Sequence, residues 1–457
     1  MLLPAGHAAT PVHCVTAAGW PALAATLPPP ASAFARAQGF SAAPGAHALL
    51  PDAAGGLAAV VLGVEEARRR HDPFAPGRLS AVLPPGDYAL AGETGDPALA
   101  ALGWLLSAYR FERYRKPQPR QARLVLPDGV DAAELGRIAA ATALGRDLVN
   151  TPASDLGPAE IEAAIRDLAD TFGAEVESVV GDDLLAAGFP MVHAVGRASP
   201  RAPRLVSLRW GAPDAPKVTL VGKGVAFDTG GLNLKTDAGM LLMKKDMGGA
   251  AAAIAAARMI MDAGLALRLR LIVPAVENAV SGDAFRPGDV LASRKGLSVE
   301  IGNTDAEGRL ILADALALAD EEAPELLIDY ATLTGAARVA LGPQLPPFYS
   351  DDDGLAAEIA RLGMAVADPV WRMPLWAPYD AMLDSKVADL NHVSGGAFAG
   401  SITAALFLRR FVEKAGSYAH FDIYGWNPAT RPGRPEGGEC QAARLTYALA
   451  KQFYPAR

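Results

Sequence analysis

Beyond residue 150, strand-like and helical segments alternate along the chain, and this order limits the possible fold more than any other feature of the sequence. Short apolar runs between turn residues predict strands at 204–210, 218–222, 267–275, 298–302, 326–332 and 418–424. Longer periodic or alanine-rich stretches predict helices at 246–263, 307–320, 402–414 and 440–451. Strands joined by helices of this length form βαβ units. We therefore predict an α/β protein whose larger, C-terminal domain has a central mixed sheet flanked by helices.

The first part of the chain differs in composition and predicts a second, smaller domain. It is rich in Ala, Pro and Gly, with turn signals such as Pro84-Pro85-Gly86 and an apolar run at 57–64 that predicts a strand. A helical pattern starts at 132 and stops at Asn150-Thr151-Pro152, because the residue before a proline disfavours helix. A chain of 457 residues also exceeds one ordinary core. The predicted parts are an N-terminal α/β domain at 1–133, a connecting helix and linker at 134–152, and the larger domain at 153–457.

Charge, cysteine content and hydropathy limit the possible partners and location. The net charge of −8 disfavours a nucleic-acid partner. Cys14 and Cys440 are the only cysteines, so a disulfide framework is excluded and a reducing cytoplasm is the expected location. The N-terminus lacks the basic and apolar regions of a secretory signal. The most apolar helical stretch, 248–267, carries Arg258 and Asp262 and predicts a buried core helix, so we expect no membrane span.

Acidic and basic side chains gather beside glycines in two parts of the larger domain. The first part is 221–235 together with 243–249, and the second is Asn303-Thr304-Asp305-Ala306-Glu307-Gly308-Arg309-Leu310. Both follow predicted strands, and ligands of an open α/β sheet gather at the carboxyl ends of strands. Asp246 is expected in the first turn of its helix, where the helix dipole favours negative charge. The carboxylates expected to converge are Asp228, Asp246, Asp305 and Glu307. Because four carboxylates alone would repel one another, we predict two divalent metals with at least one bridging carboxylate.

Motifs of other enzyme classes are missing from the sequence. Neither charged segment contains a histidine, which disfavours a His-based zinc site and a Ser-His-Asp hydrolase. Gly222-Lys223-Gly224 is followed by Phe227 where a dinucleotide fingerprint needs its third glycine, and no P-loop pattern occurs. Taken singly, an acid could be a helix cap, Lys235 a surface charge and Arg309 a solvated helix residue. The metal hypothesis therefore rests on the joint pattern of acids and lysines beside glycine-rich strand ends.

The same segments resemble the leucyl aminopeptidase family of two-metal peptidases. The octapeptide 303–310 is similar to the family signature, and 221–235 and 243–249 are similar to its other metal-site segments at the expected spacing. Further similar stretches are Asn150-Thr151-Pro152, Ala331-Thr332-Leu333-Thr334-Gly335-Ala336 and Trp371-Arg372-Met373-Pro374-Leu375. The resemblance runs from about 145 to about 425, and no motif supports it over residues 1–130. It implies a metal-dependent aminopeptidase that releases N-terminal amino acids from peptides through a water activated by two metals.

The resemblance also implies a role for each residue of the metal site. Asp228 and Glu307 would bridge the two metals. Asp305 would bind one metal, partly through its backbone carbonyl, while Lys223 and Asp246 would complete the other. A lysine ligand must be neutral, and a nearby dication lowers its pKa. The metals implied are Mn or Zn, two for each subunit of a homohexamer.

Catalytic and substrate-binding residues are carried over in the same way. Lys235 would contact the substrate carbonyl and stabilise the oxyanion. Arg309 would hold a bicarbonate-like anion that acts as general base, so the site would work without histidine. The residues implied in binding the peptide backbone are Thr332, Leu333 and Gly335. Those implied at the pocket for the first side chain are Met243 and Asn303.

The segment Asp422-Ile423-Tyr424-Gly425-Trp426-Asn427-Pro428 departs from the family, which has small apolar residues here. The aromatic side chains could simply pack in the core or in a subunit contact. Alternatively, Tyr424 or Asn427 narrows the first-residue pocket and adds a polar group, which predicts a preference shifted from leucine towards smaller or more polar residues.

Two other functions are compatible with parts of the pattern. A dimetal phosphoesterase would require His ligands or further phosphate-binding arginines near the motifs, and the sequence has neither. A non-catalytic binding protein that retains the fold is disfavoured by the intact metal residues, and a DNA-binding role is disfavoured by the negative net charge.

Overall fold

The protein is represented by a computed structural model that describes residues 2–66, 72–116 and 122–456. Its chain divides into two compact units, each with a segment from the C-terminal part of the sequence. The first unit consists of Met1–Ala143 and Ala429–Glu436, and the second of Leu144–Pro428 and Gly437–Arg457.

The division between the units falls inside helix α4 (Ala132–Asn150), where the sequence predicts a connecting helix. The predicted range 153–457 for the larger domain differs from this division in two places: the second unit already begins at Leu144, and Ala429–Glu436 belongs to the first unit. In that segment the backbone N–H of Gly433 donates a hydrogen bond of 2.6 Å to Ser107 Oγ. This return of the chain left no recognisable signal in the sequence.

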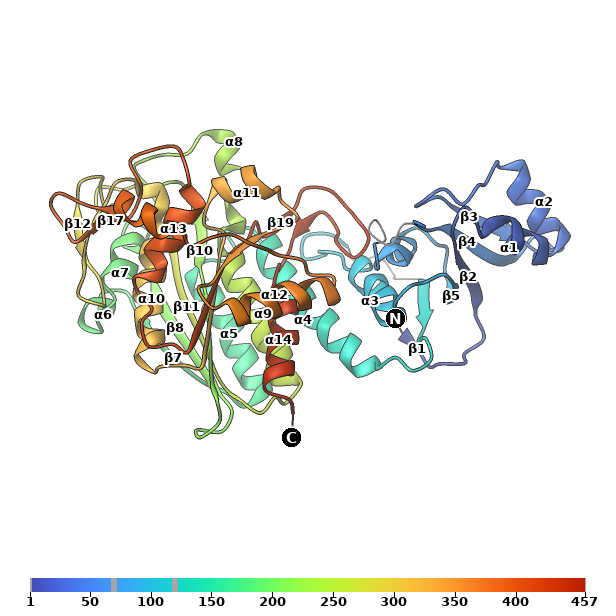
Figure 1. Ribbon diagram of the computed structural model, residues 1–457, viewed down its shortest axis with the longest axis horizontal. Helices are drawn as coiled ribbons and strands as arrows, with labels where there is room; N and C mark the ends of the chain where they lie inside the picture. The colour runs from blue at the N-terminus through green and yellow to red at the C-terminus, as the bar shows by residue number, and fades with distance from the viewer. Residues whose placement is uncertain (1, 67–71, 117–121, 457) are drawn as a thin grey trace. The chain divides into compact units, whose positions relative to one another are not determined.

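The first unit contains a six-stranded sheet in which one edge strand runs against its neighbour (Figure 1). In spatial order the strands are β1 (Leu2–Leu3), β6 (Ala122–Val125), β5 (Gly86–Gly92), β2 (Thr10–Val15), β4 (Leu57–Gly63) and β3 (His47–Pro51). All pairs are parallel except β4 with β3. The described helices are α1 (Trp20–Thr26), α2 (Pro29–Ala37), η1 (Ala75–Ala81) and α3 (Pro97–Ser107). The predicted small α/β domain is confirmed, and its predicted strand at 57–64 is β4.

The second unit contains a nine-stranded mixed sheet between two layers of helices (Figure 1). In spatial order the strands are β16 (Trp371–Arg372), β15 (Pro347–Tyr349), β18 (Ser417–Asp422), β14 (Leu326–Ala331), β9 (Lys217–Gly222), β11 (Arg268–Asn278), β8 (Arg204–Trp210) and β7 (Glu175–Val180), with β10 (Gly224–Asp228) also paired to β11. Strands β18, β14, β9, β11 and β10 are parallel to one another. The antiparallel pairs are β15–β18, β11–β8 and β8–β7.

Each face of this sheet is covered by its own group of helices (Figure 1). One group consists of α5 (Pro158–Phe172), α9 (Gly248–Asp262), α12 (Asp353–Ala365) and α14 (Ala443–Phe453). The other consists of α7 (Pro190–Gly196), α10 (Glu307–Glu321) and α13 (Gly400–Arg409). No helix in the described part of the chain is long and apolar enough to cross a lipid bilayer.

Shorter elements join these layers. Strands β12 (Val290–Ala292), β13 (Ser298–Glu300) and β17 (Leu390–Asn391) form a three-stranded sheet, and β19 (Trp426–Asn427) pairs with β20 (Gly437–Gly438). The short helices are α6 (Asp183–Ala186), α8 (Asp237–Met240), η2 (Met243–Met247), η3 (Thr304–Ala306), α11 (Gly335–Leu341) and η4 (Ala377–Leu383).

The predicted strands and helices of the larger domain are present, with shifted ends. The predicted helix 246–263 begins only at Gly248, so Asp246 lies in the preceding 3-10 turn η2 and not in the first turn of α9. The predicted helix 402–414 ends at Arg409. It ends early because the Asp320 carboxylate accepts hydrogen bonds from the backbone N–H groups of residues 413–415 and holds them in a turn.

The small residues of α9 bring this helix unusually close to the sheet. A Cβ atom on Gly249 would lie 2.2 Å from the carbonyl oxygen of Tyr330 in β14 and 2.9 Å from the backbone nitrogen of Lys223. The alanines that follow, Ala250–Ala253, are fully buried. This approach sets the position of η2, and with it Asp246, beside the ends of β9 and β14.

We predict that Gly249→Ala lowers the free energy of unfolding by about 3 kcal/mol, because its methyl group would overlap a backbone carbonyl. The control is Gly136→Ala in α4, where an added Cβ has nothing within 4 Å. There the alanine should stabilise the helix by about 0.5–1 kcal/mol. Urea unfolding followed by circular dichroism measures both. Equal stabilisation by the two alanines would contradict the close approach.

Candidate metal centre

Five parallel strands of the central sheet end at the same edge, and each delivers a polar side chain there. These residues are Lys223 after β9, Asp228 at the end of β10, Asn278 at the end of β11, Thr332 after β14 and Asp422 at the end of β18. The carboxyl edge of parallel strands is where α/β folds bind ligands. The order and direction of the strands therefore bring polar and charged residues together at one edge, as the sequence led us to expect.

The starts of two helices bring further carboxylates to this edge. Asp246 lies in η2 directly before α9, Asp305 lies in η3, and Glu307 is the first residue of α10. The side chain of Asn303 accepts a hydrogen bond of 2.8 Å from the backbone N–H of Asp305 and caps η3. Negative charge at these positions is favoured by the partial positive charge of the helix starts.

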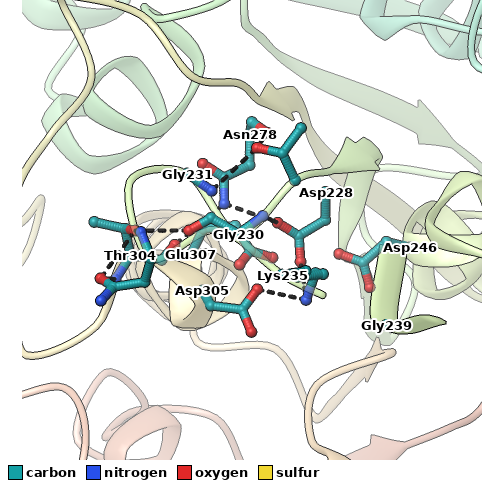
Figure 2. A network of polar contacts seen from close by, with 12 residues as sticks. Asp228, Gly230, Gly231, Lys235, Gly239, Asp246, Asn278, Thr304, Asp305 and Glu307 are labelled. Atoms are coloured by element: carbon teal, nitrogen blue, oxygen red, sulfur yellow. Dashed lines mark hydrogen bonds and ion pairs between the residues drawn. The ribbon is translucent and has the colours of Figure 1, made fainter. Parts of the chain in front are cut away.

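The carboxylates meet in one small volume, as Figure 2 shows. One oxygen from each of Asp228, Asp305 and Glu307 lies within 4.8 Å of the others. Asp228 is 2% exposed and Glu307 is 1% exposed, whereas Asp305 lies nearer to the solvent. Three carboxylate oxygens at such distances suit a hard divalent cation.

Two lysines divide the acids into two pairs. Lys223 Nζ lies 2.7 Å from Asp246 Oδ2 and 2.9 Å from Glu307 Oε1, and it also donates to the carbonyl of Thr332 at 3.1 Å. Lys235 Nζ lies 2.8 Å from Asp228 Oδ2 and forms a second ion pair with Asp305 (Figure 2). Each ammonium group thus holds two carboxylates together.

The positive charge of two lysines does not fully compensate the negative charge of four acids, three of which are buried. Burial and the charge of Asp246 raise the pKa of Asp228 to about 6. Burial and the charge of Asp228 raise the pKa of Glu307 well above its usual range. Burial lowers the pKa of Lys223, but Asp246 and Glu307 outweigh burial, so its pKa is raised overall. The site therefore favours additional positive charge.

The surroundings of one Glu307 oxygen indicate whether these residues fit a metal. Glu307 Oε2 is buried and has no hydrogen-bond partner among the residues that the structure describes, although the carboxylate as a whole is paired with Lys223. A buried carboxylate oxygen without a partner is costly, since it has lost its hydration. A divalent cation would satisfy it, so the donor set fits a metal centre.

Polar residues that sequence reasoning missed hold the carboxylates in place. Asn278 Nδ2 donates to Asp228 Oδ1 at 2.8 Å and to the carbonyl of Thr304 at 3.1 Å (Figure 2). Thr304 Oγ1 donates to the carbonyl of Gly230 at 2.6 Å. Asn278 could have been found from its place at the end of a long apolar run, which marks the end of a strand.

A cleft of about 360 Å³ opens onto the carboxylates. Most residues assigned from the sequence line it, whereas Glu307, which is buried, is not part of the lining. The assigned lining residues are Lys223, Asp228, Lys235, Met243, Asp246, Asn303, Asp305, Arg309, Thr332, Leu333 and Gly335. Two further basic residues, Lys245 and Arg338, also line it and were not singled out from the sequence.

Arg309 reaches the cleft from α10 and is anchored by a loop. Its Nη1 donates a hydrogen bond of 2.6 Å to the carbonyl of His392. Burial lowers the pKa of Arg309 to about 10. Burial and the charge of Arg309 also lower the pKa of His392 to about 3, so this imidazole is neutral. His392 Nε2 donates to the carbonyl of Asn303 at 2.9 Å, which makes it a support for the loop.

The loop after β14 is held by Asp422 from the neighbouring strand β18. Asp422 Oδ1 accepts hydrogen bonds from the backbone N–H groups of Leu333 at 3.0 Å and Thr334 at 3.1 Å. Its Oδ2 accepts from Thr334 Oγ1 at 2.6 Å. Thr332 is engaged elsewhere, since its Oγ1 donates to Asp246 Oδ1 at 2.7 Å. The loop that lines the cleft is thereby fixed to the metal centre and to β18.

Tyr424 and Asn427 do not belong to the described lining of the cleft. The Tyr424 ring lies behind the wall, with Lys245 Nζ and the Arg338 guanidinium carbon each 4.9 Å from its centroid. Asn427 is buried and donates to Glu439 Oε2 at 3.0 Å. Neither side chain therefore reaches the described cleft directly, and the altered preference for the first residue stays a prediction. Tyr424 contacts Lys245 and Arg338, which both line the cleft.

The α/β fold and the lysine–carboxylate cluster define the class of this protein as a metalloenzyme with its centre at the carboxyl edge of a parallel sheet. A family model described as "Cytosol aminopeptidase family, catalytic domain" matches residues 143–447. A second model, "M17 aminopeptidase, N-terminal domain", matches residues 10–127. The chain belongs to the cytosol aminopeptidase family, and it is a metal-dependent aminopeptidase.

Individual relatives agree with this assignment. A probable cytosol aminopeptidase of Roseiflexus castenholzii is 39% identical over 390 residues, which cover 80% of this chain and 78% of that protein. The crystal structure of the Coxiella burnetii cytosol aminopeptidase has a TM-score of 0.94 at 45% identity and covers 99% of both chains. The bottromycin maturation enzyme BotP in complex with Mn has a TM-score of 0.87 at 35% identity, covering 97% of this chain and 100% of that one.

The comparisons confirm the resemblance to leucyl aminopeptidases and extend it. The motifs supported it only from about 145 to about 425, whereas the N-terminal model matches residues 10–127 as well. The peptidase assignment also replaces the two alternatives, a phosphoesterase and a non-catalytic binding protein.

We predict that Gly308→Ala weakens metal binding about tenfold or more while leaving the fold intact. A Cβ atom at this position would lie 2.6 Å from Lys223 Cε and 2.9 Å from Lys223 Nζ, so the lysine must move away from Glu307. Disturbing a residue that positions metal ligands typically costs 10–100-fold in affinity. Calorimetric titration with Mn²⁺ measures the effect. Gly282→Ala, which meets nothing within 4 Å, is the control. Unchanged affinity in Gly308→Ala would exclude this role for Lys223.

Proposed function

We propose that the enzyme releases N-terminal amino acids from peptides with two divalent metals held by Lys223, Asp228, Asp246, Asp305 and Glu307. The main observation behind this proposal is that a buried oxygen of Glu307 has no hydrogen-bond partner among the described residues. It belongs to a group of four acids that form ion pairs with only two lysines. The pairing suggests the division of ligands. Lys223 lies with Asp246 and Glu307, while Lys235 lies with Asp228 and Asp305. When bound, divalent metals supply Lewis-acid polarisation of the scissile carbonyl and a water of lowered pKa.

Lys235 is suited to stabilise the oxyanion of the reacting carbonyl. It lines the cleft, and its ammonium group is held by Asp228 and Asp305 at the mouth of the metal centre. A cation bound by these two carboxylates would repel the ammonium group and direct it into the cleft. There its N–H groups can donate to an oxygen on which negative charge develops.

Arg309 is suited to hold a small anion such as bicarbonate. Within the described residues its guanidinium group makes one side-chain hydrogen bond, to His392, and it faces the cleft. A planar guanidinium group binds a planar oxyanion through two parallel hydrogen bonds. A bicarbonate-like anion in this position can accept a proton from the attacking water, which gives the site a general base although no histidine lines the described cleft.

The loop after β14 is suited to bind the peptide backbone. Thr332, Leu333 and Gly335 line the cleft beside the metal centre, and Asp422 fixes the loop from behind. Met243 and Asn303 line the same cleft and are placed to border the first side chain. A loop held this firmly loses little conformational freedom when substrate binds, which favours affinity.

The proposal also includes the identity of the metals, the assembly of the subunits and the location of the enzyme in the cell. Mn or Zn is supported by the oxygen-rich donor set and by the Mn complex of the similar enzyme BotP. A homohexamer is supported by large apolar side chains that are exposed on the second unit, namely Leu234, Leu241, Val339 and Phe398. A cytoplasmic location is supported by two buried free cysteines.

We expect chelation to abolish activity without unfolding the protein, because the ion pairs of Lys223 and Lys235 still hold the carboxylates together. The measurement is hydrolysis of aminoacyl anilides after dialysis against a chelator, followed by addition of Mn²⁺ or Zn²⁺. Circular dichroism monitors the fold. Full activity in protein shown by elemental analysis to be free of metal would refute the proposal.

We expect Lys235→Ala and Arg309→Ala each to lower kcat about 10²-fold, since a preorganised oxyanion donor and a positioned general base each contribute about this much. Bound metal is quantified in each variant, so that loss of chemistry is separated from loss of metal. The exposed Lys386→Ala serves as control. Near-normal kcat in a fully metal-loaded Lys235→Ala would exclude an oxyanion role for this lysine.

A further inference from the structure

The wall of the cleft contains a buried lysine without an anionic partner. Lys245 is 2% exposed and lines the cleft. Within the described residues its side chain forms no ion pair and no hydrogen bond, and its Nζ lies 4.9 Å from the centroid of the Tyr424 ring in a cation–π contact. The adjacent Asp246 is already engaged by Lys223 at 2.7 Å and by Thr332 at 2.7 Å.

A second basic residue shares the same aromatic ring. Arg338 projects from α11, lines the cleft and has its guanidinium carbon 4.9 Å from the Tyr424 centroid. Its Nη1 donates a hydrogen bond of 3.2 Å to the carbonyl of Thr334. No carboxylate of the described chain lies within ion-pair distance of this guanidinium group. The two cations therefore contact the same aromatic ring, and neither forms an ion pair with the described residues.

Two buried arginines of the second unit, by contrast, each have an acid beside them. Arg146 Nη2 lies 2.8 Å from Glu439 Oε2, and Arg270 Nη1 lies 2.9 Å from Glu322 Oε1. A buried ammonium group without such a partner is costly in free energy. At Lys245 the protein tolerates this cost at a position that faces the substrate cleft. A binding site for an anion explains why, because the partner then arrives with the ligand.

We propose that Lys245 and Arg338, supported by Tyr424, form a subsite that binds a carboxylate of the peptide substrate. The proposal rests on the proposed peptidase function and names a class of substrate for it. The planar guanidinium group of Arg338 matches a carboxylate with two parallel hydrogen bonds. The Tyr424 ring restrains both cations and leaves their N–H groups available to the cleft.

The carboxylate can come from two parts of a peptide. Met243 lies two residues before Lys245 and is placed at the pocket for the first side chain, so an N-terminal Glu or Asp could bring its side chain to the subsite. A dipeptide could instead bring its terminal carboxylate. Both sources use the same recognition chemistry, and substrates that carry only one of them distinguish the two.

The experiment compares kcat/KM within two matched substrate pairs at low ionic strength with Mn²⁺ present. One pair is the p-nitroanilides of Glu and Gln, which differ only in the side-chain charge. The other is Ala-Ala and its C-terminal amide, which differ only in the terminal charge. We expect the acid to be preferred at least tenfold in one pair, which identifies the source of the carboxylate.

The variants Arg338→Met and Lys245→Met should bring that acid-to-amide ratio close to one, whereas the exposed Lys414→Met should leave it unchanged. Arg338 is partly exposed, so its variant tests the subsite even if the substitution of buried Lys245 disturbs folding. A ratio near one in the wild type for both pairs would overturn the inference. So would a preference for the acid that survives in Arg338→Met.

A binding measurement separates this inference from the proposed function. If the wild type hydrolyses no substrate of either pair, the proposed function fails. Calorimetry with free L-glutamate against L-glutamine, and with Ala-Ala against its amide, then decides the subsite alone. Binding of one acid at least tenfold tighter than its amide, lost in Arg338→Met, supports the subsite, and equal binding within both pairs rejects it.

Discussion

The mutual repulsion of four acids at one sheet edge is the constraint on which the second unit depends. Five parallel strands and two helix starts converge there, so the fold cannot keep Asp228, Asp246, Asp305 and Glu307 apart. Two lysines reduce the repulsion by pairing with two acids each, and Asn278 fixes the orientation of Asp228. The remaining negative charge suits the edge to divalent cations, and this is the basis of the proposed metal site for peptide hydrolysis.

Close packing of the backbone is the second requirement of this arrangement. Gly249 brings α9 against β14, and Gly308 leaves room for the Lys223 side chain beside α10. Neither contact contributes a ligand. Both determine where a ligand-bearing turn or side chain lies, so a single methyl group at either position acts on the centre from outside it. The loop after β14 is held in a comparable way by Asp422, which contacts the loop and not the proposed metal ligands.

The sequence predicted the parts of this structure that local patterns encode. Alternating strands and helices indicated the α/β fold, and acids placed after strands indicated the metal site, because strand ends converge in such a fold. Residues that hold the site in place from distant positions in the sequence were not predicted. Asn278, His392 and Asp422 act through hydrogen bonds to residues 26 or more positions away in the cases described here, and nothing in their immediate neighbours indicates those partners. The start of α9 was also misplaced, since the 3-10 turn before it has the composition of a helix.

The return of Ala429–Glu436 to the first unit has a consequence for biosynthesis. In that segment Gly433 donates to Ser107, and the Arg434 guanidinium carbon lies 4.7 Å from the Phe74 ring centroid. A nascent chain emerges from the ribosome N-terminus first, so residues 1–143 are exposed long before these contacts can form. The N-terminal unit is therefore begun early but is completed only after Ala429–Glu436 has been translated, long after the rest of its residues.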